Sequence, residues 1–119
     1  SMMKVLDKTQ RMNDLLDQYG KLLTKKQYEI MHLHYQEDLS LSEISEELNI
    51  SKAAASDTIR KCELRLEKLE SELGLIIKSE QRNIIYEQLN LITPANQKLV
   101  KKLQNLETSE IKEDSVCQK

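Results

Sequence analysis

Residues 39–59 contain the signals of two short helices joined by a tight turn, and this stretch constrains the fold of the chain most. Ser40 can accept a backbone N–H at the start of the first helix, and Glu43 stands where a capping box has its second acceptor. Asn49 follows this helix, and asparagine tolerates the left-handed conformation that ends many helices. Ser51 can then cap the second helix. Such a pair is a helix-turn-helix unit, whose second helix can enter the major groove of DNA.

The second helix of this unit is predicted to be long. Its apolar residues step by four, three, four, three and four positions, a heptad repeat; they are Ala55, Ile59, Cys62, Leu66, Leu69 and Leu73. Gly74 is expected to end or kink the helix. The charged residues of its second half are expected on exposed faces; they are Glu63, Arg65, Glu67, Lys68, Glu70 and Glu72. The recognition helix therefore continues well past the residues that a DNA groove can contact.

Two helices are predicted before this unit. The first spans residues 4–19 and ends at Gly20, which is expected to be its C′ residue. The second opens at Thr24, with Gln27 three residues later completing a capping box. Its apolar members are Tyr28, Ile30, Met31, Leu33 and Tyr35.

Two more helices are predicted after Gly74. A fifth helix contains the apolar residues between Leu75 and Ile92, and a sixth starts at Pro94 with Thr93 as its N-cap. The stripe of the sixth helix consists of Leu99, Val100, Leu103 and Leu106. The expected organisation is a tag remnant and N-terminus over 1–3, a helix-turn-helix core over 4–73 with its turn near 48–51, a helical arm over 74–107 and a disordered tail over 108–119.

The composition narrows the functions available to this chain. Phe and Trp are absent and the four tyrosines are scattered, which argues against a base-stacking platform for single-stranded nucleic acid. No apolar run approaches the roughly 20 residues of a membrane helix, and no secretory signal is visible, so no membrane insertion is expected. Cys62 and Cys117 are far apart and form neither a metal pair nor a disulfide framework, which predicts a reducing, cytoplasmic location.

No group of residues supports catalysis, and we predict neither a metal nor a cofactor. The sequence has no glycine-rich phosphate loop, no metal-ligand spacing and no Cys-His pair with support from its surroundings. His32 and His34 are the only histidines. Two positions apart on a helix, they point about 200° apart and cannot share a metal. We therefore expect that the protein is not an enzyme.

Binding to nucleic acid depends on the exposed residues near the start of the long helix. The candidates are Lys52, Ser56, Arg60 and Lys61, which can meet phosphates or base edges. Asp57 lies among them and repels phosphate. Lys8 and Arg11 lie off the apolar stripe of the first helix, on a face that is either solvated or in contact with phosphate.

The net charge of −2 limits the affinity expected for nucleic acid. Residues 1–50 carry a charge of −3, residues 51–73 are neutral and residues 74–119 carry +1. Because neutralised phosphates supply most non-specific affinity, a single copy should bind duplex DNA or RNA weakly. The apolar stripes also exceed what one thin hairpin can bury, which predicts a homodimer.

The order of residues in the first half of the chain resembles that of a known family. Leu23-Thr24-x-Lys26-Gln27, then Leu39-Ser40-Leu41-x-Glu43-Ile44 and Ile50-Ser51, resembles the fourth region of bacterial sigma factors. With Lys8-Thr9-Gln10-Arg11-Met12-Asn13 upstream, roughly residues 5 to 90 are similar to the YlxM family of small bacterial helix-turn-helix proteins linked to the signal recognition particle pathway. The resemblance implies an all-α fold, with a sigma region 4-like helix-turn-helix, an extended recognition helix and additional C-terminal helices.

The resemblance also implies a function, and a second function fits the sequence as an alternative. The first is a DNA-binding regulatory protein that takes part in the signal recognition particle pathway. The alternative is a protein- or RNA-interaction module that contacts the particle's GTPase or RNA and keeps the helix-turn-helix as a scaffold only. Family members typically carry arginine and glutamine after the serine cap, where this chain has Lys52 and Ala53. The near-neutral recognition helix favours the alternative.

Overall fold

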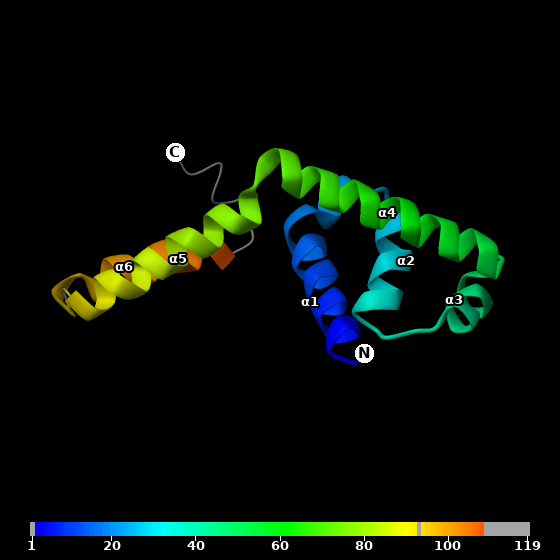
Figure 1. The fold of residues 1–119 in the computed structure, drawn as a ribbon, viewed down its shortest axis with the longest axis horizontal. Helices are drawn as coiled ribbons and strands as arrows, with labels where there is room; N and C mark the ends of the chain where they lie inside the picture. The colour runs from blue at the N-terminus through cyan, green and yellow to red at the C-terminus, as the bar shows by residue number, and fades with distance from the viewer. Residues whose placement is uncertain (1, 93, 109–119) are drawn as a thin grey trace, which may run out of the picture. The chain divides into compact units, whose positions relative to one another are not determined.

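The computed structural model describes residues 2–92 and 94–108, and it confirms the predicted all-α class. Over these residues it contains six α-helices and two short 3₁₀ segments, and no strand: α1 (Met2–Tyr19), η1 (Gly20–Leu22), α2 (Lys25–Tyr35), α3 (Leu41–Leu48), α4 (Lys52–Leu73), α5 (Leu75–Ile92), η2 (Pro94–Asn96) and α6 (Gln97–Thr108) (Figure 1). Pro94 therefore begins a 3₁₀ turn ahead of the sixth helix. The expected Thr93 cap, Ser1 and the tail from residue 109 lie outside the described residues.

The chain divides into two compact units, residues 1–76 and residues 77–119. In the first unit α1, α2 and α3 all pack against the long helix α4 (Figure 1). The side chains between them form one core, whose largest fully buried members are Tyr19, Leu15, Ile30, Met31, Ile44, Leu66 and Cys62. The core thus lies along α4 from Ala55 to Leu66 and fixes which faces of this helix remain in water.

The ends of α2 and α4 are formed by the predicted residues. Thr24 accepts the Gln27 backbone N–H at 3.2 Å, and the Gln27 side chain accepts the Thr24 N–H at 3.0 Å, so the capping box is complete. Gly74 ends α4 in the left-handed conformation, with φ 62° and ψ 29°. The break between α4 and α5 therefore comes from a glycine that can adopt a positive φ without strain.

The role predicted for Gly20 is wrong. This residue does not have the left-handed conformation of a C′ glycine, and it begins the 3₁₀ segment η1. Its constraint is space, because a Cβ atom at this position would lie 2.8 Å from Cε2 of Tyr28. Tyr28 itself is 39% exposed, since its ring lies beside Gly20 outside the core.

The buried stripe of α4 departs from the heptad repeat at its C-terminal end. Leu66 is buried as predicted, but Leu73 is 44% exposed, and Glu70, expected in water, is only 8% exposed. The Glu70 carboxylate accepts hydrogen bonds from the Tyr19 hydroxyl and from the Ile76 backbone N–H. The prediction failed because hydrogen bonds from Tyr19 and from the first turn of α5 replace those with water and offset the cost of burying this acid.

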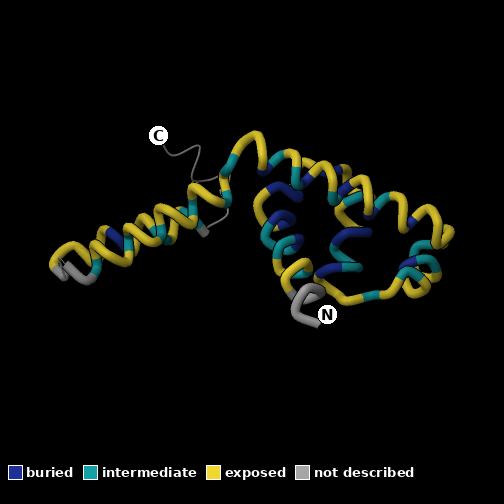
Figure 2. The backbone as a smooth tube through the Cα atoms, viewed as in Figure 1, coloured by how far each residue is buried: buried dark blue, intermediate teal, exposed yellow. Residues whose placement is uncertain are grey.

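The second unit contains a pair of antiparallel helices formed by α5 and α6. Gln104 on α6 donates to Glu87 on α5 at 2.9 Å, and Glu107 accepts from Arg82 one turn nearer the start of α5. Val100 on α6 is buried at 3% exposure, whereas most other described side chains of the pair are exposed (Figure 2).

Candidate nucleic-acid interface

The turn between α3 and α4 has the geometry that the sequence predicts. Ser40 and Glu43 form a reciprocal capping box at the start of α3, and accepting the Ser40 N–H lowers the pKa of the Glu43 carboxyl. Asn49 ends the helix in the left-handed conformation, with φ 55° and ψ 48°. Two hydrogen bonds between Ser45 and Ile50 close the turn. The Ser45 hydroxyl donates to the Ile50 carbonyl, and the Ile50 N–H donates to the Ser45 carbonyl.

This turn positions the start of α4 so that one face of the helix is buried and the opposite face is exposed. The Ser51 hydroxyl accepts the Ala54 N–H at 3.0 Å, and Ala55 and Ile59 pack into the core. Because the apolar side of the first two turns is buried, the opposite side must face water. Lys52, Ser56, Arg60 and Lys61 are all exposed. Lys52, Ser56 and Arg60 are spaced by four and share one face of the helix.

Asp57 is the acid that lies among these residues, and it forms ion pairs with two of them. Its carboxylate oxygens are 2.9 Å from the Arg60 guanidinium and 2.9 Å from the Lys61 ammonium. The hydrogen bonds from Lys61 and then from Arg60 lower the pKa of Asp57. All three side chains are well exposed, so the pairs are screened by water and can open.

Lys8 and Arg11 both remain largely in contact with water, with side chains 59% and 42% exposed, and each pairs with an acid of α4. Lys8 is 2.9 Å from Glu63, and Arg11 donates two hydrogen bonds of 3.0 Å to Glu67. The hydrogen bond with Glu67 raises the pKa of Arg11. These cations join α1 to α4, and a phosphate would have to compete with an acid for each of them.

The sequence analysis assigned Glu63 and Glu67 to exposed faces of the long helix and missed their pairing with α1. Glu63 also accepts a hydrogen bond of 2.8 Å from the Tyr35 hydroxyl, so this one acid ties both α1 and α2 to α4. One signal was available in the sequence. Lys8 and Arg11 are separated by one helical turn, and so are Glu63 and Glu67, as expected for two facing helices with matched charges.

A shallow pocket of about 190 Å³ lies beside the first half of α4. Its polar lining consists of Lys8, His34, Tyr35, Ser56, Arg60 and Glu63. His34 Nδ1 is 3.0 Å from the Leu39 carbonyl oxygen, which can only accept, so Nδ1 carries the proton. The pocket brings Ser56 and Arg60 together with Lys8, while Lys52 and Lys61 lie outside its lining.

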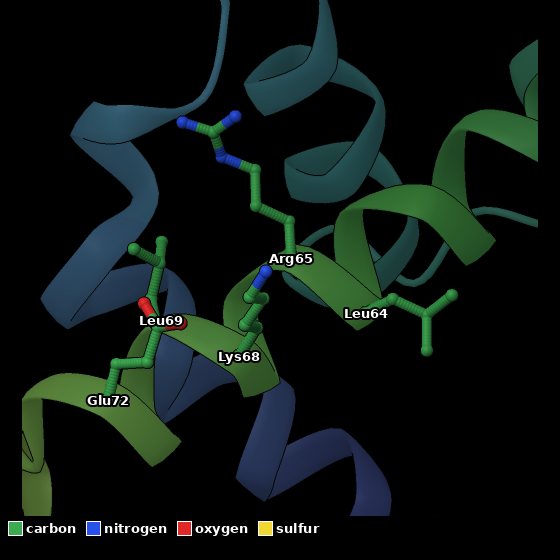
Figure 3. Close-up of a pocket in the computed structure, with 5 residues that line it drawn as sticks. All are labelled: Leu64, Arg65, Lys68, Leu69 and Glu72. Carbon is green, nitrogen blue, oxygen red and sulfur yellow. The ribbon is translucent and has the colours of Figure 1, made fainter.

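A second hollow, of about 440 Å³, lies along the other half of α4 and is lined by Leu64, Arg65, Lys68, Leu69 and Glu72 (Figure 3). Leu64 is 63% exposed and points away from the other four side chains. Arg65 donates to the Leu22 carbonyl at 3.2 Å. The sequence analysis missed this apolar and basic surface because Leu64 lies outside the heptad repeat.

Nothing in the described residues indicates catalysis. Within them, no three His, Cys, Asp or Glu side chains lie close enough together to hold a metal ion. His32 and His34 bind separate partners, Gln36 and the Leu39 carbonyl. Among residues 2–92 and 94–108, no helix is long and apolar enough to cross a membrane.

Comparison with known proteins gives one family. The family model described as "Putative helix-turn-helix protein, YlxM / p13 like" matches residues 6–106. A UPF0122 protein of Halalkalibacterium halodurans is 42% identical over 109 residues, which cover 89% of this chain and all of that protein. A UPF0122 protein of Exiguobacterium sibiricum is 49% identical over 84 residues, which cover 71% and 79% of the two chains. A UPF0122 protein of Lactococcus lactis subsp. cremoris is 42% identical over 102 residues, which cover 86% of this chain and 92% of that protein.

Proposed function

Because the chain belongs to the YlxM/p13-like family of helix-turn-helix proteins, we propose that it is a regulatory protein that binds duplex nucleic acid through the start of α4. One observation carries this proposal. Lys52, Ser56 and Arg60 share an exposed face of a helix whose first turn is fixed by the hydrogen bonds of Ser45 and Ser51. In a major groove this face would meet phosphates and base edges.

The binding we propose is weak and nearly independent of sequence. Lys52, Arg60 and Lys61 supply three positive charges, and Asp57 offsets one of them. Two effective phosphate contacts per copy correspond to about micromolar or weaker binding at physiological salt. Ala53 and Ala54 offer base edges nothing beyond a methyl group, so they add little discrimination between sequences.

The resemblance to YlxM proteins supports a further proposal, that this binding serves the signal recognition particle pathway. The alternative is an interaction module that contacts the particle's GTPase or RNA and uses the helix-turn-helix as a scaffold. One observation favours it. The hollow lined by Leu64, Arg65, Lys68, Leu69 and Glu72 places apolar side chains next to two cations, a combination that suits an acidic amphipathic helix of a protein partner.

Fluorescence anisotropy with labelled random and genomic duplexes tests the main proposal. Titrations at several salt concentrations should give a log–log slope of about −2 per bound copy. Arg60→Ala should reduce the magnitude of the slope by about 1, and Asp57→Asn should increase it by about 1. Salt concentrations of 0.15 M and 1 M differ by about 0.8 decade. Over this interval the steeper slope of Asp57→Asn should make its affinity at 0.15 M roughly fivefold tighter than that of the wild type, relative to their affinities at 1 M.

Lys68→Ala is the matched control, because Lys68 is an exposed cation of the same helix outside the proposed interface. A change in affinity equal to that of Arg60→Ala would mean that general charge, rather than this face, binds the duplex. No binding of any duplex at tens of micromolar would contradict the proposal. Binding of the particle's purified GTPase that is lost in Leu64→Glu would then establish the alternative.

A further inference from the structure

The α5–α6 hairpin of the second unit is an antiparallel pair of helices, and its hydrogen bonds show which sides of the two helices face each other (Figure 1). On α5, Ser79 and Tyr86 both donate to Glu107 of α6, at 3.0 and 3.4 Å. On α6, Val100 is buried at 3% exposure and lies seven positions before Glu107. Because residues seven positions apart lie on one side of a helix, these four residues mark the inner sides of the hairpin.

The remaining sides of the two helices form two broad faces of the hairpin. A residue one position before the inner side is turned by about 100° toward one broad face, and a residue one position after it is turned toward the other. In an antiparallel pair, an approximate two-fold axis perpendicular to the plane of the helices relates one helix to the other, so equivalent positions share a broad face. Ile85 precedes Tyr86, and Leu99 precedes Val100. Ile85 and Leu99 therefore lie on the same broad face.

This broad face, which we call the leucine face, carries five large apolar side chains. Each lies one position before the inner side or one turn from such a residue, and each is between 40% and 76% exposed; they are Ile85, Leu89, Leu99, Leu103 and Leu106. The hydrogen bond between Gln104 and Glu87 sets the register of the two helices. Leu106, two positions after Gln104, therefore lies level with Ile85, two positions before Glu87. The apolar side chains of the two helices adjoin across the hairpin, and a contiguous apolar surface of this kind marks an interaction site.

The acids of the hairpin lie away from the leucine face or are neutralised beside it. Glu80 and Glu87, the two acids of α5, each follow an inner residue and so lie on the opposite broad face, together with the exposed Ile84. Glu107, the one acid of α6, is paired with Arg82 at 2.6 Å, and its side chain is only 15% exposed. Among residues 75–92 and 94–108, no unpaired acid therefore lies on the leucine face.

Lysines border the leucine face at the outer edge of α6. Lys98 and Lys102 are exposed, and each comes immediately before a leucine of this face. We propose that the leucine face binds an anionic lipid surface, with the hairpin lying flat on it and both lysines reaching the headgroups. Leucines on one side of a helix with lysines beside them are typical of helices that lie in the plane of a membrane interface without spanning it.

The charges favour a lipid surface over a second copy of the chain. The leucine face of a second copy would bring the same lysines and no unpaired acid to meet them. Anionic headgroups neutralise the lysines, whose flexible stems can follow the apolar surface while their ammonium groups stay in water. This inference does not depend on the proposed function.

Co-sedimentation of the full chain with lipid vesicles tests the proposal. Vesicles of phosphatidylcholine with roughly one third phosphatidylglycerol present the anionic surface, and vesicles of pure phosphatidylcholine are the neutral control. The wild type should be half bound near ~0.1 mM anionic lipid, an affinity comparable to that of a single acyl chain. It should bind the neutral vesicles at least ~10-fold more weakly, because each lysine at an anionic surface contributes about fivefold.

Substitutions on the two broad faces separate the leucine face from general apolar exposure. Leu103→Glu/Leu106→Glu should weaken binding to anionic vesicles by at least ~100-fold, because two leucines leave the lipid and two acids meet the headgroups. Ile84→Glu is the matched control, since it makes the same kind of change at an exposed apolar residue of the opposite face. It should weaken binding by less than ~5-fold.

A pair of lysine variants keeps the test decisive if the double leucine variant loses helicity by circular dichroism. Lys102→Gln should weaken binding to anionic vesicles about fivefold. Lys101 follows Val100 and so lies on the opposite face, and Lys101→Gln should weaken binding less than about twofold.

Five results would overturn the proposal. The first two are no binding of the wild type at ~1 mM anionic lipid and equal binding to neutral and anionic vesicles. The next two are a double leucine variant that keeps both its helicity and its binding, and equal losses for Ile84→Glu and the double leucine variant. The fifth is a wild-type dimer that binds no vesicles and dissociates in the double leucine variant, which would assign the face to a second copy.

Discussion

Replacing Glu70 by alanine is expected to destabilise the first unit strongly, although the residue lies on a helix rich in exposed acids. Its carboxylate accepts hydrogen bonds from the Tyr19 hydroxyl and the Ile76 N–H, and the Tyr19 oxygen in turn accepts the Leu75 N–H at 3.2 Å. Burial, followed by the hydrogen bond with Glu70, raises the pKa of Tyr19, so its proton stays in place to donate. Without Glu70, two donors lose their acceptor.

The structure sets the size of this effect. A buried donor left without an acceptor costs about 1–3 kcal/mol, and water can reach the half-buried Ile76 more easily than Tyr19. The expected loss is therefore about 2–4 kcal/mol in the free energy of unfolding. For a unit of this size, that loss lowers the melting temperature by roughly 10–20 °C.

Thermal and urea unfolding followed by circular dichroism measure this loss. Glu72→Ala is the matched control, because Glu72 is an exposed acid two residues further along the same helix, and its loss should be within about 0.5 kcal/mol. Glu70→Gln keeps an acceptor oxygen and should fall between the two. In a double-mutant cycle, Tyr19→Phe and Glu70→Ala should be non-additive. Equal melting temperatures for Glu70→Ala and Glu72→Ala would refute the reasoning.

Two further contrasts can be measured by the same unfolding experiments. Leu66→Ala should cost about 2–5 kcal/mol because Leu66 is completely buried, whereas Lys52→Ala should change stability by less than about 0.5 kcal/mol; equal losses would mean that α4 faces the other way. Gly74→Ala should cost about 1–2 kcal/mol because φ is 62° there, while Gly20→Ala should cost less because the exposed Tyr28 ring can move aside; a larger loss at Gly20 would reverse the assignment of the two glycines.

The features that the sequence predicts correctly are local. Each capping box joins residues three positions apart, Thr24 with Gln27 and Ser40 with Glu43, and the left-handed Asn49 is bonded to Ser45, four positions away. Because both partners of such a hydrogen bond lie within one helical turn, the local sequence is enough to predict it. The exposure of the four residues proposed to contact nucleic acid follows from the same local signals, because Ala55 and Ile59 fix the buried side of α4.

The features that the sequence does not predict join residues far apart in the chain. Arg11 and Glu67 are 56 positions apart, and Tyr19 and Glu70 are 51 apart. A helical wheel of α4 alone shows Glu67 and Glu70 as polar residues and assigns both to water. Their actual partners depend on which face of α1 meets α4, and no local pattern contains that information. The exposure of Leu73 has the same origin, since Glu70 occupies the buried position near it.

These long-range pairs also change what the charge of the recognition helix means. Residues 51–73 are neutral overall, which argues against binding to nucleic acid when every charge is counted equally. Glu63 and Glu67 are matched by cations of α1, and Glu70 is withdrawn from the surface. The exposed face at the start of α4 keeps Lys52, Ser56, Arg60 and Lys61, with Asp57 as the one acid among them. Its local charge is therefore about +2, so a neutral helix can present a positive surface to a phosphate backbone.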